Sequence, residues 1–155
     1  MHIAKGECPR TIARRYSPKN HNRMPNPTSK YAGTNAIEAP FIMKHGGYYY
    51  LFVSWDYCCM GSKSTYRVVV GRSKTVDGPY VDRDGNDMRE GGGTPVIAGD
   101  KKLFEAIGHC AAYNMNGEDI YISHGYSVKH KGAAILVQRP IKWTSDGWPE
   151  LVDSF

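Results

Sequence analysis

Glu38 is the residue whose type and position first suggest chemistry. It stands at the start of an apolar stretch, with Ile37 before it and Ala39, Pro40 and Phe41 after it. A carboxyl group among such neighbours is expected to be partly removed from water, which favours the protonated form that a general acid needs. The alternative is a strand-end glutamate that faces solvent, which is the commoner use of such a position.

Two strands of a β-hairpin are the elements expected to position Glu38. The first covers 34–44, the turn is at His45-Gly46-Gly47, and the second covers 48–55, where aromatic and β-branched residues dominate. Another strand is expected at 65–73 and a short segment at 80–81. After an apolar piece at 95–98, a second hairpin is expected from 108–113 and 119–126, and an outer strand at 135–140.

The two hairpins form a faint internal repeat. Aligning Gly46 with Gly117 gives an offset of 117 − 46 = 71, and the same offset carries Glu38 onto His109, since 109 − 38 = 71. This alignment predicts that both polar residues occupy one structural position in successive repeats. Repeats of antiparallel strands at this spacing are typical of β-propeller blades, whose inner strands line a central channel. A two-sheet sandwich would have a similar number of strands and is the alternative.

The expected fold class is therefore all-β, with the chain forming one partial β-propeller domain over residues 1–155. Within it we expect 1–33 to be the end of a preceding blade plus a loop, and 34–82 and 94–155 to be successive blades. A propeller needs at least about four blades to close its ring. We therefore expect the remaining blades, or a second copy of the chain, as a partner.

Composition narrows the other possibilities. The formal net charge of +5 comes largely from basic residues in the first thirty positions: Lys5, Arg10, Arg14, Arg15, Lys19, Arg23 and Lys30. Prolines interrupt this run and no nucleic-acid-binding motif accompanies it, so a solvated loop is favoured over nucleic-acid binding. No apolar run reaches membrane-spanning length and no secretion signal is evident, so we expect no membrane partner.

The four cysteines are expected to be free thiols. Cys8, Cys58, Cys59 and Cys110 have neither the paired spacing of a zinc site nor the density of a disulfide scaffold. Cys58 and Cys59 are adjacent, and neighbouring cysteines rarely bridge.

Several segments, taken in order, resemble the arabinanases of glycoside hydrolase family 43. They are 35–42, 47–59, 64–73, 78–80, 90–94, 108–109 and 146–149. Any one of these motifs alone would be weak evidence for the family, but their occurrence in this order over 35–149 is specific to it.

The resemblance implies a five-bladed propeller that cleaves α-1,5-linked L-arabinofuranose chains, the arabinans and arabino-oligosaccharides, with inversion. It identifies Glu38 as the general acid and places His109 beside an axial calcium ion held largely through water. It assigns the border of the sugar-binding cleft to Trp55, Asp56, Tyr57 and Cys58.

The resemblance also implies that part of the catalytic machinery lies outside this chain. In the family, the general base and a second aspartate belong to two blades that precede the glutamate blade, and Glu7 is the only carboxylate before residue 34. We therefore expect the chain to be inactive alone or to need a partner. A non-catalytic sugar-binding or structural half-propeller that self-associates is the alternative function.

Overall fold

The structure is a computed structural model that describes residues 36–152. The expected N-terminal segment 1–33, with its basic run and Cys8, lies outside the described residues. The described part is all-β apart from the short 3-10 helices η1 (Gly61–Lys63) and η2 (Met88–Glu90). The all-β prediction is therefore confirmed. No helix in 36–152 is both long and apolar enough to cross a membrane.

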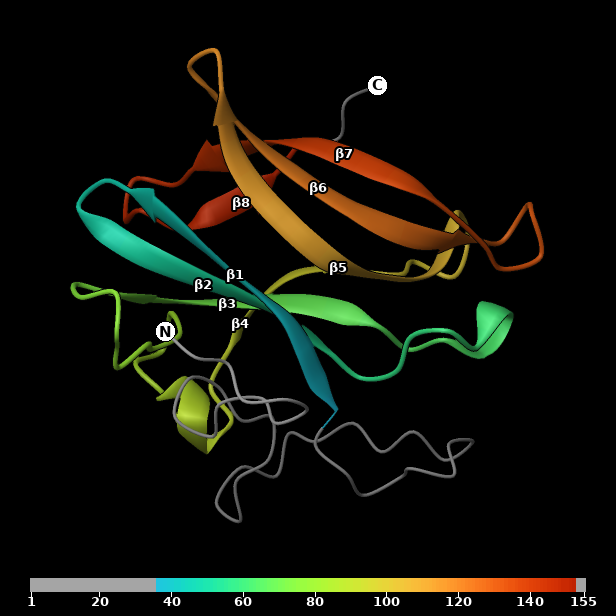
Figure 1. Ribbon diagram of the computed structural model, residues 1–155, viewed down its shortest axis with the longest axis horizontal. Helices are drawn as coiled ribbons and strands as arrows, with labels where there is room; N and C mark the ends of the chain where they lie inside the picture. Colours follow the sequence, from blue (N-terminus) through green and yellow to red (C-terminus); the bar gives the residue numbers. More distant parts are fainter. Residues whose placement is uncertain (1–35, 153–155) are drawn as a thin grey trace.

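Eight strands form two antiparallel sheets, each with its strands in sequence order (Figure 1). The first sheet contains β1 (Ile37–His45), β2 (Tyr48–Trp55), β3 (Arg67–Ser73) and β4 (Thr94–Ala98). The second contains β5 (Phe104–Met115), β6 (Glu118–Ser127), β7 (Ala133–Trp143) and β8 (Pro149–Leu151). A four-stranded meander of this kind is the unit from which propeller blades are made.

The boundary between the sheets differs from the expected one. We expected the segment from residue 94 to open the second repeat, but β4 pairs with β3 and belongs to the first sheet. The second sheet begins at Phe104. The short segment expected at 80–81 forms only isolated bridges, which join Val81 to Arg72 and to Asp87. The apolar residues of β4 therefore cover the edge of β3, which periodicity alone did not distinguish from the start of a new hairpin.

The strand pairings of the two hairpins correspond, but at an offset of 70 residues and not 71. Glu38 pairs with Ser54, and Gly108 pairs with His124, so 108 − 38 and 124 − 54 both equal 70. The aligned glycines were mismatched because each turn has two residues with positive φ, Gly46-Gly47 and Asn116-Gly117. The predicted equivalence of Glu38 and His109 is therefore wrong by one residue.

A β-bulge follows immediately in both inner strands. The register shifts between Glu38 and Phe41 in β1, and between Gly108 and Ala111 in β5. The residue within each bulge has positive φ, 50° at Ala39 and 56° at His109. His109 therefore corresponds to Ala39, and the counterpart of Glu38 is Gly108. Glu38 and His109 are thus one position apart when the two repeats are aligned. Bulges redirect side chains, which is how both residues come to lie in one region.

The main core lies between the sheets. The first sheet contributes buried aromatic and β-branched side chains, and the second contributes smaller ones beside a buried tyrosine: Tyr50, Phe52, Val68 and Val70 on one side, and Cys110, Ala112, Tyr121 and Ile141 on the other. The first sheet also has a core on its other face, where Leu51, Val53 and Val69 pack against Tyr80 and Met88 from the loop after β3. Strand β2 is nearly all buried because both of its faces are covered.

A polar clasp joins the sheets at the hairpin turns. Asp119 lies 2.9 Å from Nδ1 of His45 and accepts a 2.7 Å hydrogen bond from Nε1 of Trp143. The His45 and Trp143 rings stack with centroids 3.8 Å apart. The turn of the first sheet is thereby fixed to β6 and β7, the middle strands of the second.

Candidate active site

Glu38 lies near the start of β1, as expected, but its side chain is exposed. The predicted partial burial among apolar neighbours is therefore wrong within the described residues. The reason is that the chain neighbours Ile37 and Ala39 are themselves only partly buried, so they do not enclose the carboxyl group. One carboxylate oxygen, Oε1, accepts a hydrogen bond from the hydroxyl group of Tyr66.

His109 reaches the same region from β5. Its backbone N–H donates a 2.8 Å hydrogen bond to Oγ of Ser54, which fixes the bulge of the second sheet against β2 of the first. Its ring centroid lies 6.2 Å from that of His124. The two sheets therefore bring Glu38, His109 and His124 together although they are not equivalent positions of the repeat.

His124 lies at the centre of this cluster. Burial lowers the pKa of its imidazole, the neighbouring His109 lowers it further, and the Glu38 carboxylate acts in the opposite direction. Its Nε2 lies 3.3 Å from the hydroxyl of Tyr126, and its ring centroid is 5.9 Å from that of Tyr66. At neutral pH the imidazole is expected to be uncharged, so it can accept or donate a hydrogen bond.

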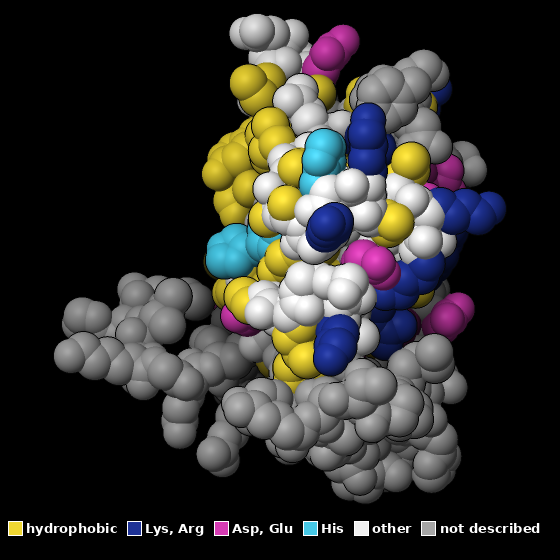
Figure 2. Space-filling view, turned by 90° about the vertical axis from the view of Figure 1, so that its right-hand side faces the viewer, with side chains coloured by type: hydrophobic (Ala, Val, Ile, Leu, Met, Phe, Trp, Pro, Cys, Tyr) yellow, Lys and Arg dark blue, Asp and Glu magenta, His cyan; other side chains and the backbone are white. Residues whose placement is uncertain are grey.

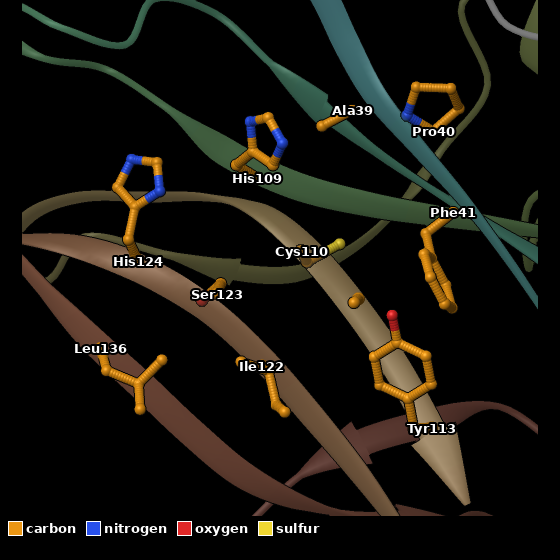
Figure 3. A pocket seen from close by; sticks show the side chains of 11 residues that line it. Ala39, Pro40, Phe41, His109, Cys110, Tyr113, Ile122, Ser123, His124 and Leu136 are labelled. Atoms are coloured by element: carbon orange, nitrogen blue, oxygen red, sulfur yellow. The ribbon is translucent and has the colours of Figure 1, made fainter.

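A hollow of about 460 Å³ opens beside the histidines. His109 and His124 stand at one end of it, and Phe41 and Tyr113 stand at the other, from β1 and β5 (Figure 3). The Phe41 and Tyr113 rings meet edge to face with centroids 4.9 Å apart. Ile122 and Leu136 extend the apolar wall along β6 and β7. A hollow with polar groups at one end and an aromatic and aliphatic wall is suited to a small polar ligand.

The four residues expected to border a sugar-binding cleft are placed differently from one another. Trp55 and Asp56 are buried, Trp55 in the second core of the first sheet and Asp56 in an ion pair with Arg67 at 3.0 Å. Tyr57 and Cys58 are partly exposed. None of the four lines the hollow. In the described structure, only Tyr57 and Cys58 are accessible enough to touch a ligand without a rearrangement.

The prediction of free thiols is wrong for two cysteines. Cys58 and Cys59 form a disulfide between neighbouring residues. The backbone turns sharply here, because Cys59 has a φ of 64°, and its N–H donates a 2.7 Å hydrogen bond to the hydroxyl of Tyr126. Cys110 is free and buried, and burial raises its thiol pKa to about 12, so it is unreactive.

A metal site was expected at His109, and the described residues supply little of one. Within 36–152 no three side chains of His, Cys, Asp or Glu are grouped to hold an ion. Calcium prefers six to eight oxygen ligands, and an imidazole supplies one nitrogen. The described residues could therefore make at most one direct contact to a metal ion, through His109.

Sequence reasoning assigned no role to Tyr66, His124, Ser54 or Tyr126. Tyr66 and His124 both stand in segments that we singled out, the first before β3 and the second in the returning strand of the second hairpin. Correct register would have revealed His124, because it pairs with the Gly108 next to His109. Tyr66 gave no such signal, since its contact with Glu38 spans 28 positions of the chain.

Comparison with known proteins places this arrangement in a family. The sequence model of the family 'Glycosyl hydrolases family 43' matches residues 12–149. The chain belongs to glycosyl hydrolase family 43. This confirms the predicted family.

The similar proteins act on arabinan. An extracellular exo-alpha-(1->5)-L-arabinofuranosidase of Cellvibrio japonicus is 45% identical over 120 residues, 77% of this chain and 34% of that protein. An extracellular endo-alpha-(1->5)-L-arabinanase of Bacillus subtilis is 41% identical over 114 residues, 74% of this chain and 34% of that protein. The chain thus spans about a third of the length of these curated relatives.

Solved structures show the same likeness. An exo-1,5-alpha-L-arabinanase from a bovine ruminal metagenomic library has a TM-score of 0.80 and 49% identity, covering 93% of this chain and 44% of that one. An alpha-L-arabinanase of Cellvibrio cellulosa, solved with arabinohexaose, has a TM-score of 0.75 and 44% identity, covering 78% of this chain and 38% of that one.

Proposed function

We propose that this chain is part of a glycoside hydrolase that cleaves α-1,5-linked L-arabinofuranose chains with inversion, and that Glu38 is its general acid. The observation that carries the proposal is the exposed Glu38 carboxylate, held by Tyr66 beside the cluster of His109 and His124. Membership in family 43 and the arabinan-degrading relatives support the substrate class.

The proposed chemistry needs a second carboxylate from elsewhere. Inverting glycosidases place the acid and the base roughly 6.5–9.5 Å apart, so that a water molecule fits between the base and the sugar. Asp56, at the end of β2, is buried and paired with Arg67, so it is not available as the base. We propose that the base comes from preceding blades of a five-bladed propeller, in which the two sheets described here are successive blades.

The exposed face of the second sheet supports this completion. Leu136 is 71% exposed and Tyr113 is 47% exposed, and both line the hollow. Figure 2 shows hydrophobic side chains gathered along the left side of the described part with some of the histidines beside them, while Lys and Arg lie in the middle and toward the right. Apolar faces of this kind are usually covered by a partner.

The test is hydrolysis of linear arabinan. The chain is assayed alone and together with the part of the Cellvibrio japonicus relative that lies outside the matched segment. We expect arabinose or arabino-oligosaccharides from the combination, and a loss of about 10²–10⁴-fold in rate for Glu38→Gln, because general acid catalysis contributes that much.

Glu118→Gln is the matched control. Glu118 is an exposed glutamate at the start of β6, in the turn region and away from the cluster, so its substitution should leave the rate unchanged. An active combination in which Glu38→Gln and Glu118→Gln are equally fast would rule out Glu38 as the acid.

A calcium ion near His109 remains part of the proposal, held mainly by water and by groups outside 36–152. The described residues fit only one contact to it, so no catalytic step is assigned to the ion. Removal of metal with a chelator is expected to lower the thermal stability or the activity of the combination. No change in either would contradict a bound ion.

The second candidate function is a non-catalytic, sugar-binding or structural half-propeller that self-associates. The exposed apolar face favours it equally, because a second copy could cover that face. Light scattering of the chain alone separates the two. A stable dimer without arabinan hydrolysis in any combination supports this candidate.

A further inference from the structure

We propose that Tyr66 is a positioning residue for Glu38: its hydroxyl holds Oε1 of the carboxyl group, so that Oε2 carries the proton to the substrate. This inference rests on the proposed function. It concerns a residue that lies just before β3 and approaches Glu38 from 28 positions further along the chain.

Tyr66 is fixed on several sides. Its side chain is only 1% exposed and packs with Ala106 and Tyr126, which belong to the second sheet. Its backbone carbonyl accepts a 3.1 Å hydrogen bond from the N–H of Ile107. Its position is therefore set by the contact between the two sheets and not by the strand that carries Glu38.

The hydroxyl of Tyr66 has two polar neighbours. It donates to Oε1 of Glu38, and the buried Ser54 hydroxyl lies on its other side. Burial raises the pKa of Tyr66 far above its usual value, and the hydrogen bond to the Glu38 carboxylate raises it further. The phenol therefore stays protonated and keeps the proton that it donates to the carboxyl group. The Ser54 hydroxyl also accepts a hydrogen bond from the N–H of His109, so one buried hydroxyl connects the bulge of the second sheet to Tyr66.

Gly108 makes room for the tyrosine ring. A Cβ at this position would lie 2.1 Å from Cδ1 of Tyr66. Gly108 is also the counterpart of Glu38 in the second sheet, because both pair with a residue of the returning strand in the same register. The first sheet thus carries the carboxyl group at this position, and the second leaves it empty so that the supporting ring fits.

This arrangement assigns the two carboxyl oxygens. Oε1 accepts the hydrogen bond from the phenol, and within the described residues no hydrogen bond joins Oε2, so the acidic proton belongs on Oε2. In the reaction that proton passes to the glycosidic oxygen as its bond to the anomeric carbon breaks. Water adds to that carbon and gives its proton to the carboxylate base supplied from outside 36–152. The Tyr66 hydrogen bond becomes charge-assisted when Glu38 turns into a carboxylate, which favours the transfer.

The first experiment tests the contact in the chain alone, with tyrosine ring carbons labelled at Cζ. Because Tyr66 is buried, its hydroxyl proton should exchange slowly and give a resonance that disappears in Tyr66→Phe. Glu38→Gln should shift the Tyr66 hydroxyl and Cζ signals, while Glu118→Gln should leave them in place. If Glu38→Gln does not move them, the two groups are not hydrogen-bonded and the inference is overturned.

The second experiment compares leaving groups in the completed enzyme. Tyr66→Phe is expected to lower kcat on arabinan about tenfold with KM within about twofold, since a positioned acid acts mainly in the transition state. On a nitrophenyl arabinofuranoside, whose leaving group needs little protonation, the loss should be less than about twofold.

Tyr121→Phe is the matched control, because Tyr121 is equally buried but lies in the core between the sheets. It should leave kcat unchanged on both substrates. Equal losses on both substrates in Tyr66→Phe would mean a structural role and would refute the inference. If the wild-type combination hydrolyses no arabinan, the proposed function fails, while the hydroxyl resonance still decides whether Tyr66 holds Glu38.

Discussion

The two sheets share one backbone plan and use it for different purposes. Their inner hairpins match in register, in the position of the bulge and in the two-residue turn, at an offset of 70. At matching positions the first sheet has Glu38 and Ser54, and the second has Gly108 and His124. The comparison shows that a repeat can keep its geometry while one copy supplies a reactive group and the other supplies the space around it.

The sheets also differ in how they are covered. The first has a core on both faces, one against the second sheet and one against Tyr80 and Met88 from its own loop. The second is covered on its other face only in part, by Phe41 against Tyr113 and by Tyr66 against Tyr126, and leaves Leu136 and Tyr113 exposed there. This difference suggests where a further part of a propeller, or another copy of the chain, would attach.

Gly108→Ala is expected to have the largest effect on this comparison. Its Cβ would overlap the Tyr66 ring at 2.1 Å, and the buried ring has little room to move. We expect a loss of about 3 kcal/mol in the free energy of unfolding, measured by urea titration of the chain.

Gly46→Ala is the control for that substitution. An added Cβ at Gly46 would meet nothing within 4 Å, so only its positive φ of 53° opposes alanine. This backbone effect should cost about 1 kcal/mol. If Gly108→Ala is no more destabilising than Gly46→Ala, the Tyr66 ring does not need a glycine at position 108. The proposed difference between Glu38 in the first sheet and Gly108 in the second would then be contradicted.

Asp100→Ala tests the link between the sheets and should have an intermediate, pH-dependent effect. The Asp100 carboxylate accepts hydrogen bonds of 2.8–3.0 Å from the backbone N–H groups of residues 102, 103 and 104 at the start of β5. The backbone N–H of Phe104, with that of Lys102, holds the pKa of Asp100 below its usual value. Because the folded pKa is depressed, the stabilisation is present above about pH 4 and is lost as the pH falls through the folded pKa.

We therefore expect Asp100→Ala to lower the free energy of unfolding by about 1 kcal/mol at pH 7, with a smaller difference near pH 3. Urea titrations at the two pH values measure this. Asp84→Ala serves as the control, because Asp84 is exposed and within the described residues its carboxylate accepts no hydrogen bond. A difference between wild type and Asp100→Ala that does not change with pH would contradict the assignment.

Leu136→Lys should have the smallest effect on the chain itself. Because Leu136 is 71% exposed, the free energy of unfolding should change by less than about 0.5 kcal/mol. Association should respond instead: we expect Leu136→Lys to weaken self-association, or binding of an N-terminal portion, in light scattering. Leu103→Lys alters a side chain that is 63% exposed in the loop between the sheets and should not change association. Equal behaviour of both variants would show that the exposed face of the second sheet is not the attachment surface.

Much of the local structure could be predicted from sequence. Alternating apolar residues and turn glycines correctly placed both inner hairpins, because such strands and turns depend on neighbours close in the chain. The segment from residue 94 was assigned to the wrong repeat because a short apolar strand does not reveal its partner. The register was missed by one residue because either glycine of the first turn could be aligned with Gly117.

The candidate site was only partly predictable. Glu38 and His109 could be selected by type and position, and the structure brings them into one region, although they are not equivalent. Cys58 and Cys59 were expected to stay apart because neighbouring cysteines rarely bridge, but the backbone turn at Cys59 pairs them. Trp55 and Asp56 were expected to border the sugar-binding cleft, but in this chain their side chains are buried.

The sequence by itself determined the strand pattern, the repeat and the family, because these depend on local periodicity and on ordered motifs. Only the tertiary structure decided that Tyr66 meets Glu38 and that Gly108 accommodates its ring. Those contacts join residues far apart in the chain and depend on how two sheets pack. A shift of one residue in register would exchange the faces on which the side chains lie.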